Sequence, residues 1–203
     1  MTVAIIIIIA ISAISIAGFS QNELIYKYQF NAWQIKHRKE YIRLISHGFF
    51  HADWMHLLIN MFVLYSFSDA VIYYFAQSLP GNPNLLFIVF FFSAIAVSSL
   101  YSFVKEKDNY NYNAIGASGA VSAVVFASIL YDPYATIYLY FIPVPGVVLG
   151  IGYLVYSRIM SKKNIDNIGH DAHFWGAVYG MVFPIIFEPR LLIDFFQQIF
   201  FLY

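Results

Sequence analysis

Two residues 55 positions apart have the side chains needed for nucleophilic chemistry. Ser118 lies in the sequence GASGA, and His173 lies in AHFWGAVYG. A histidine can activate a serine by taking its hydroxyl proton, and can later protonate a leaving amine. Upstream, His56 and Asn60 are four residues apart and share one helical face, where both could donate hydrogen bonds to an oxyanion beside the Ser118 backbone N–H. The pattern predicts a Ser–His dyad.

Each of these residues also has a structural interpretation. Small residues let membrane helices pack closely, so Ser118 taken alone is more often a packing residue. His173 could be an ordinary hydrogen-bonded histidine, and Asn60 could bridge two helices. The combination of these residues favours catalysis over the separate structural interpretations.

Glycines supply a way to bring the dyad together. Gly176 and Gly180 follow His173 at a spacing of four, and Gly119 and Ala123 form a small face after Ser118. Such faces let two helix backbones approach closely. We therefore expect the helix that carries Ser118 to pack against the helix that carries His173.

Metal chemistry is the rival interpretation. Six histidines, with Asp53 and Asp171, could ligate zinc. However, the HExxH motif is absent and no glutamate lies centrally in a membrane segment. His47 and His51, four residues apart, leave a two-ligand surface site open. We expect neither a metal nor another cofactor, and the lack of cysteine excludes thiol chemistry.

The composition is typical of a membrane protein. Of 203 residues, 61% are hydrophobic and 11% are charged, against about 25% charged in soluble domains. The 11 basic and 11 acidic residues cancel, so no bulk charge favours a nucleic-acid partner. The lipid bilayer is the expected environment.

The chain is expected to be an all-α polytopic membrane protein with six helices in a membrane domain, residues 1–189. The first segment has neither the basic start nor the cleavage site of a signal peptide, so a membrane helix is favoured. Residues 20–52 are expected to form an interfacial insert, and residues 190–203 an amphipathic tail. The predicted spans are Val3–Phe19, Leu57–Phe75, Leu85–Val104, Ala117–Tyr131, Thr136–Ile159 and Ala172–Phe187.

The fourth span is too short to cross a bilayer. From Ser118 to Asp132 a helix rises about 21 Å, whereas the bilayer core is about 30 Å thick. Ser118 would then lie about 10 Å below one surface, by the same arithmetic. The polar, glycine-containing chain before it needs protein or water around it, which predicts a wet cavity with Ser118 near its floor.

Together these residues resemble the rhomboid intramembrane serine proteases over about residues 40–188. HGFFHADWMHLLINM is similar to the family's histidine-rich start of its second helix, at His51, His56 and Asn60. GASGA resembles the GxSG motif of the nucleophile, and AHFWGAVYG the motif that carries the base. FIPVPGVVLGIGYLVYS resembles the family's proline-containing fifth helix.

The resemblance implies a six-helix bundle with a Ser118–His173 dyad and an outward-facing cavity. His56, Asn60 and the Ser118 N–H would form the oxyanion hole, with His51, Gly116, Gly119, Gly176 and Gly180 in support. It also implies single-pass transmembrane proteins as substrates, a cap from Ser161 to Asp171, and a substrate gate at the fifth helix. A multi-pass protein of a bacterial inner membrane is expected, in an oligomeric state that the sequence does not define.

The chain departs from the family pattern in three places. Family members commonly carry an aromatic residue four positions after the nucleophile, stacked on the catalytic imidazole. Here that position is Ser122, and Phe174 and Trp175 are the candidate substitutes. The usual Trp-Arg pair of the insert is Ile42-Arg43. The family's second helix often ends in a glycine-rich turn that contains a glutamate. In this chain only Asp69 corresponds to that turn.

The distribution of basic residues conflicts with an outward-facing site. With a cytoplasmic N-terminus, ten basic residues lie on the outer side and only Arg190 on the inner side, opposite to the positive-inside rule. We keep the orientation that the resemblance implies. The outer residues are Lys27, Lys36, Arg38, Lys39, Arg43, Lys105, Lys107, Arg158, Lys162 and Lys163.

Three functions follow from these observations. The favoured one is an intramembrane serine endopeptidase. The alternative is a catalytically weak or inactive rhomboid-like protein that binds membrane-protein clients, for which Ser122 is the only hint. The third is a metal-binding or transport protein.

Overall fold

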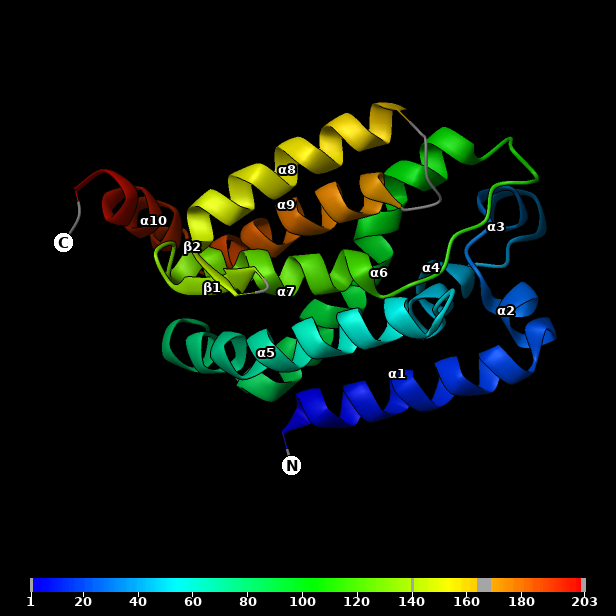
Figure 1. Cartoon of the computed structure of the whole chain (residues 1–203), viewed down its shortest axis with the longest axis horizontal. Coiled ribbons are helices and arrows are strands. Elements are labelled where there is room, and N and C mark those ends of the chain that lie inside the picture. Colours follow the sequence, from blue (N-terminus) through cyan, green and yellow to red (C-terminus); the bar gives the residue numbers. More distant parts are fainter. Residues whose placement is uncertain (1, 140, 164–168, 202–203) are drawn as a thin grey trace.

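A computed structural model describes residues 2–139, 141–163 and 169–201 of the chain. The described residues are predominantly helical (Figure 1). The elements are α1 (Val3–Ser20), α2 (Asn22–Tyr28), α3 (Ala32–Arg38), α4 (Arg43–Ser46), the 3-10 turn η1 (His47–Phe49), α5 (Trp54–Ser78), α6 (Pro83–Glu106), α7 (Ser118–Tyr131), β1 (Thr136–Leu139), β2 (Ile142–Pro145), α8 (Gly146–Lys163), α9 (His170–Phe187) and α10 (Arg190–Phe201).

Three of these helices, α1, α5 and α6, are long and apolar enough to cross a membrane. The number rises to four if α9 and α10, which meet at a bend of 120°, are counted as one broken span. The expected helical membrane protein is thereby confirmed. Length and composition alone support fewer spans than the six expected from the sequence.

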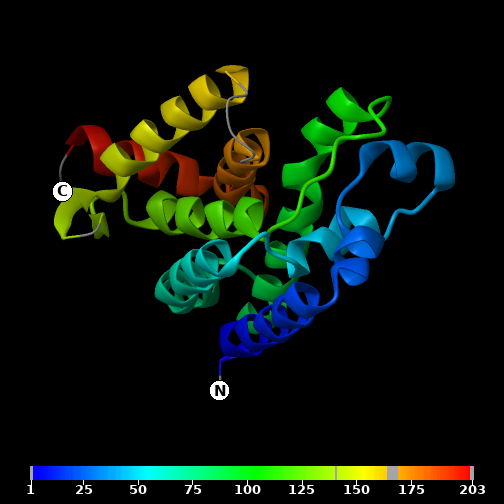
Figure 2. The ribbon, with the colours of Figure 1, turned by 45° about the vertical axis from the view of Figure 1, so that its right-hand side comes forward.

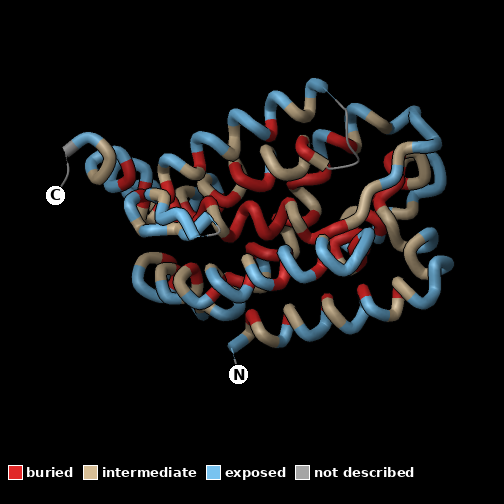
Figure 3. Tube along the Cα trace, viewed as in Figure 1, coloured by how far each residue is buried: buried red, intermediate tan, exposed pale blue. Residues whose placement is uncertain are grey.

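Helix α7 is the centre of the molecule. Eleven of its 14 residues are buried, and α5, α6, α8, α9 and α10 all pack against it. Figure 2 shows the same arrangement from a second side, and Figure 3 shows α7 as the buried strip between exposed outer helices. The first turn of α7, which begins at Ser118, therefore lies among the ends of several helices. We call the end of the molecule at which α7 begins the site end.

The predicted span Thr136–Ile159 is wrong in its first ten residues. Strands β1 and β2 form an antiparallel hairpin there, with Thr136 paired to Pro145 and Leu139 to Ile142. Pro143 and Pro145 explain the difference, because proline lacks an N–H and disfavours helical backbone in the residue before it. Helix α8 begins at Gly146, directly after the second proline.

The segment between α1 and α5 folds into α2, α3, α4 and η1 at the site end. Asn31 connects it to the chain that leads to Ser118: its Nδ2 donates to the carbonyl oxygens of Tyr110 and Tyr112. A bridge between Phe30 and Ala114 lies beside these bonds. The insert is thus fastened to the loop that positions the serine.

Arg43 holds the insert together from within. Its Nη1 donates to the carbonyl oxygens of Tyr26 and Gln29, and its Nε donates to Glu40. The side chain is 5% exposed. Arg43 therefore stabilises this segment from within, although Ile42 replaces the tryptophan of the family's Trp-Arg pair.

Helix α10 carries the expected amphipathic pattern, but only part of its apolar stripe is exposed. Leu191 and Phe195 are buried, and Ile199 packs partly against the same core. Leu192, Phe196 and Phe200 remain exposed.

Candidate active site

Ser118 and His173 are within hydrogen-bond distance of each other. The Nε2 atom of His173 lies 2.7 Å from the Oγ atom of Ser118. Ser118 is the first residue of α7, and His173 lies in the first turn of α9. Both residues are half-buried, so each keeps part of its surface exposed. This is the geometry that proton transfer from a serine hydroxyl to an imidazole requires.

Backbone contact between α7 and α9 brings the pair together. A Cβ atom on Gly176 would collide with the carbonyl oxygen of Gly119, and one on Gly180 with that of Ala123. A Cβ on Gly119 would collide with the side chain of Ser98 on α6. The expected close approach of these two helices is present.

Gly116 allows the loop to enter the site. Its φ angle is +129°, a value that residues with a side chain rarely adopt. In addition, a Cβ there would lie 2.7 Å from Cε1 of His56 and 3.8 Å from Ser118 Oγ. The glycine therefore serves both the backbone turn and the close approach of the His56 ring.

The N-terminus of α7 points its free N–H groups at the site. The first N–H groups of a helix have no intrahelical acceptor, and the helix dipole favours negative charge there. The first α7 residue whose N–H is bonded to the preceding turn is Val121, which donates to the carbonyl of Ala117. The backbone N–H groups before Val121 therefore lie at the positive end of the helix dipole.

The side chains of His56 and Asn60 differ in the hydrogen bonds that they make within the chain. Asn60 is buried, and its Nδ2 donates to the carbonyl oxygen of His56. The ring of His56 makes no hydrogen bond to any part of the chain that the structure describes; it packs edge-on against the ring of His51 at 4.9 Å. His56 thus has a donor to offer, and Asn60 has one amide proton left.

The side chain of His51 connects α1 to Ala117, the residue before Ser118. Ser15 Oγ donates its only proton to the carbonyl of Phe49, so its 2.8 Å contact with His51 Nδ1 must be donated by the histidine. His51 Nε2 then carries the lone pair and accepts from the N–H of Ala117 at 3.4 Å. The ring is fully buried, and burial, reinforced by the nearby His56, lowers its pKa to about 3. A neutral His51 therefore supports the loop.

The structure corrects the aromatic support expected for the imidazole of His173. Neither Phe174 nor Trp175 stacks on His173 in the described residues; Trp175 stacks on Tyr101 instead. The ring of Tyr153, from α8, stacks on the imidazole with centroids 6.1 Å apart and planes 24° apart. The Tyr153 hydroxyl lies 2.6 Å from Ser122 Oγ.

Sequence reasoning missed Tyr153, although a signal for it exists. Gly146, Gly150, Tyr153 and Ser157 recur at spacings of four, three and four, which places them on one helical face. The other three are the buried residues of α8. The same face therefore predicts that Tyr153 points inward.

Asp171 joins three helix ends beside the dyad. It forms a salt bridge of 3.1 Å with Lys105 of α6 and accepts a hydrogen bond from Ser161 of α8. This contact fixes both ends of the expected cap from Ser161 to Asp171. Residues 164–168 of that cap lie outside the described residues.

The described residues offer no cluster of three histidine, aspartate or glutamate side chains that could hold a metal ion. His47 and His51, for which a two-ligand surface site was left open, do not share a helical face, because η1 ends at Phe49 and His51 lies outside any helix; both side chains are buried. His47 Nδ1 contacts the carbonyl oxygen of Arg43 at 2.9 Å. Burial lowers the pKa of His47 to about 4.

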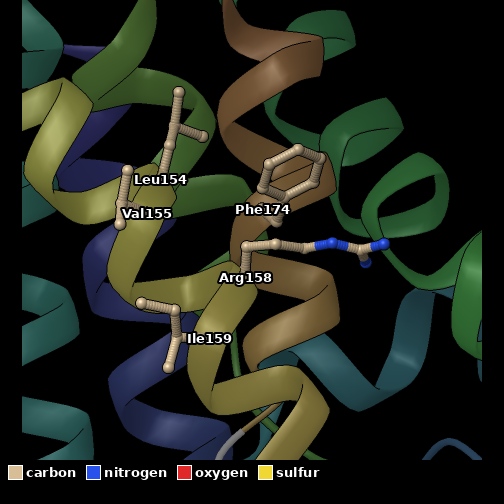
Figure 4. A pocket seen from close by; sticks show the side chains of 5 residues that line it. All are labelled: Leu154, Val155, Arg158, Ile159 and Phe174. Carbon is tan, nitrogen blue, oxygen red and sulfur yellow. The ribbon is translucent and has the colours of Figure 1, made fainter.

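An apolar groove of about 320 Å³ lies between α8 and α9, but it does not contain the dyad (Figure 4). Its walls are Leu154, Val155, Arg158, Ile159 and Phe174. The Arg158 side chain passes beside the Phe174 ring in Figure 4. The groove is therefore separate from the serine, which lies at the start of α7.

Comparisons with known proteins identify the family of the chain. The Rhomboid domain family matches residues 38–190. RHOMBOID-like protein 12, mitochondrial, of Arabidopsis thaliana is 31% identical over 150 residues, which cover 68% of this chain and 44% of that protein. Presenilin-associated rhomboid-like protein, mitochondrial, is 29% identical in Mus musculus and 28% in Homo sapiens over 140 residues, 66% of this chain and 34% of theirs.

The matched region spans less than half the length of these curated relatives. Their names place them in mitochondria, which conflicts with the bacterial inner membrane expected from the sequence. An integral membrane protein with several candidate spans is the assignment that stands.

Proposed function

This chain belongs to the rhomboid family, and on that premise we propose that it is an intramembrane serine endopeptidase that cleaves single-pass membrane proteins in or near their transmembrane segments. The observation that carries the proposal is the 2.7 Å contact between Ser118 Oγ and His173 Nε2. It lies at the start of a short, buried helix, and both residues of the pair are half-buried.

In the proposed reaction His173 takes the hydroxyl proton while Ser118 Oγ attacks the scissile carbonyl carbon. The tetrahedral intermediate collapses to an acyl-enzyme as the protonated His173 gives its proton to the leaving amine. Water, activated by the same imidazole, then attacks the acyl carbon. Its proton passes through His173 to Ser118, and the carboxylate product leaves.

The negative charge of the intermediate needs donors that are already in place. The free N–H groups at the start of α7, beginning with that of Ser118, supply one side. The ring of His56, 4.9 Å from the ring of His51 and beside Gly116, supplies a second donor. Asn60 adds its remaining amide proton from one turn further along α5.

The proposal includes a six-span topology formed by α1, α5, α6, α7, α8 and α9. Helix α7 is too short to cross a bilayer alone, and the helices around it enclose it. Water would reach the dyad from the site end, where the insert lies at the membrane surface. Helix α10 would then lie along the opposite interface with its exposed apolar residues in lipid.

A client-binding protein without protease activity remains the alternative function. Its support in the sequence was the missing aromatic at Ser122. Because Tyr153 places an aromatic ring on His173, that position no longer favours loss of activity.

The test is cleavage of a panel of tagged single-pass membrane proteins by the purified chain in proteoliposomes. We expect at least one substrate to be cut in or near its membrane segment, and Ser118→Ala and His173→Ala each to abolish the cut. Full activity in either variant contradicts the dyad. Binding of clients by a folded wild type that cuts none of them would establish the alternative.

A further inference from the structure

We propose that Tyr153 of α8 is a positioning residue for the catalytic base and that Ser122 of α7 is its anchor. The Tyr153 ring holds the imidazole of His173 toward Ser118, and Ser122 fixes the Tyr153 hydroxyl. Because the ring comes from α8, the position of the imidazole depends on the position of that helix. The inference rests on the proposed protease function. It assigns to a residue on another helix the support that the family pattern places four residues after the nucleophile.

The Tyr153 ring is held between two other rings. Its centroid lies 6.1 Å from that of His173, at an interplanar angle of 24°, and 5.8 Å from that of Phe126, at 46°. These separations fall within the range of favourable aromatic contacts. The ring therefore limits rotation of the imidazole on one face.

Hydrogen-bond directions fix the tyrosine hydroxyl. Ser122 Oγ donates its single proton to the carbonyl oxygen of Ser118 at 2.8 Å. In the 2.6 Å contact between Ser122 and Tyr153, the tyrosine must therefore be the donor. The chain of contacts closes on itself: Tyr153 to Ser122, Ser122 to the Ser118 backbone, Ser118 to His173, and His173 back to the Tyr153 ring.

The serine at position 122 and the tyrosine at position 153 complement each other in size. Ser122 is 6% exposed, so a large side chain there would occupy the space that the Tyr153 ring now fills. One turn before Tyr153, Gly150 lets α8 approach α7, because a Cβ there would lie 3.3 Å from Ile129 and 3.4 Å from Phe126. Small residues at these two positions therefore leave room for the Tyr153 ring between α8 and α7.

This arrangement makes the base sensitive to the position of α8. The buried residues of α8 are only Gly146, Gly150 and Ser157, so little apolar side-chain area holds the helix. The Tyr153–Ser122 bond is the side-chain hydrogen bond that joins α8 to α7 in the described residues. An outward movement of α8 would remove the Tyr153 ring from the imidazole of His173.

The first experiment compares Tyr153→Leu and Tyr153→Phe with wild type in detergent, on a substrate that the wild type cleaves. Leucine removes the ring, so we expect kcat to fall about tenfold with KM within about twofold, because Tyr153 positions the base and does not bind substrate. Phenylalanine keeps the ring and loses only the anchor, so we expect a fall of at most about threefold in kcat.

A matched control separates positioning from general destabilisation. Tyr179, six residues after His173 on α9, makes the same kind of contacts with α6: its hydroxyl lies 2.6 Å from Ser93 Oγ, and its ring stacks on Phe90 at 6.0 Å. Tyr179→Leu should lower the Tm much as Tyr153→Leu does, while the kcat of the folded protein stays at the wild-type value.

A swap of the two residues tests the role of the ring directly. Ser122→Tyr combined with Tyr153→Ser moves the aromatic ring to α7, and we expect the double variant to recover most of the kcat that Tyr153→Ser alone loses. Wild-type kcat in Tyr153→Leu, an equal loss of kcat in Tyr179→Leu, or no recovery in a folded double variant would each overturn the inference. Failure of the proposed function looks different, because wild type and Ser118→Ala would then be equally inactive, and the positioning role would fall with it.

Discussion

Gly176 of α9 lies against Gly119 of α7 so closely that no side chain fits between them. A Cβ atom on Gly176 would stand 2.8 Å from the carbonyl carbon and 3.0 Å from the Cα of Gly119. These are backbone atoms, which cannot rotate away as a flexible side chain can. Gly119 directly follows Ser118 and Gly176 lies about one turn after His173, so this contact sets the separation of the two helices at the dyad.

Gly176→Ala should therefore push α9 from α7 and misplace the base. We expect the cleavage rate to fall about 100-fold and the free energy of unfolding to fall by about 1–3 kcal/mol. Cleavage rate and Tm in detergent measure the two effects. Gly152→Ala on α8 is the matched control, because nothing lies within 4 Å of its Cβ position; equal activity losses in both variants would contradict the packing argument.

Arg43→Ala should loosen the insert. The substitution leaves the carbonyl oxygens of Tyr26 and Gln29 without their charged donor, so we expect a loss of about 3 kcal/mol in stability. The Tm should fall by roughly 5–10 °C. Lysine cannot reproduce the fork of donors, so Arg43→Lys should rescue little of the loss.

Lys36→Ala provides the control within the same insert. Its ion pair with Asp108 is exposed, with side chains 37% and 68% accessible, and such pairs contribute about 0–1 kcal/mol. A drop in Tm as large as that of Arg43→Ala would show that the insert responds to any lost charge, contrary to our assignment of Arg43.

The free energy of unfolding should decrease as the pH drops below about 6.5, the usual pKa of a histidine in an unfolded chain. Burial lowers the native pKa of His47 to about 4 and that of His51 to about 3, so both are neutral when folded. Between these values the unfolded chain binds more protons, and its relative free energy drops as pH decreases. For two buried histidines, the free energy of unfolding decreases by at most about 4 kcal/mol between pH 7 and pH 5.

The measurement is Tm in detergent between pH 7.5 and pH 5, for wild type and for His47→Asn with His51→Asn. The double variant has lost both titrating groups, so its Tm should vary less with pH, whatever its absolute value. An unchanged pH dependence would show that other groups control acid stability.

The sequence predicts the parts of the site that depend on helical spacing. Ser118, His173 and the small residues between their helices follow a period that places each on a definite face, and the structure brings them together. Tyr153 was missed because its contact depends on how α8 sits against two other helices, which the period of one helix does not define. Its inward face was nevertheless visible in the small residues at positions 146, 150 and 157.

Local backbone preference explains the error at the fifth predicted span. Hydropathy treats residues 136–159 as one apolar segment, whereas Pro143 and Pro145 divide it into a hairpin and a helix. Hydrogen bonds such as those of Asn31 to Tyr110 and Tyr112 connect positions about 80 residues apart. No local pattern in one sequence indicates such pairs, so the attachment of the insert could not be predicted.

The most direct test of the central claim is the site of labelling by a fluorophosphonate probe, which forms a covalent bond with a serine activated by a base. The purified protein in detergent is treated with the probe, and the modified residue is identified by peptide mass spectrometry. We predict a label on Ser118 that disappears in Ser118→Ala and falls about 100-fold in His173→Ala. A folded wild type that takes no label, or a Ser118→Ala variant that takes the same label, would contradict the assignment of Ser118 and His173 as a catalytic dyad.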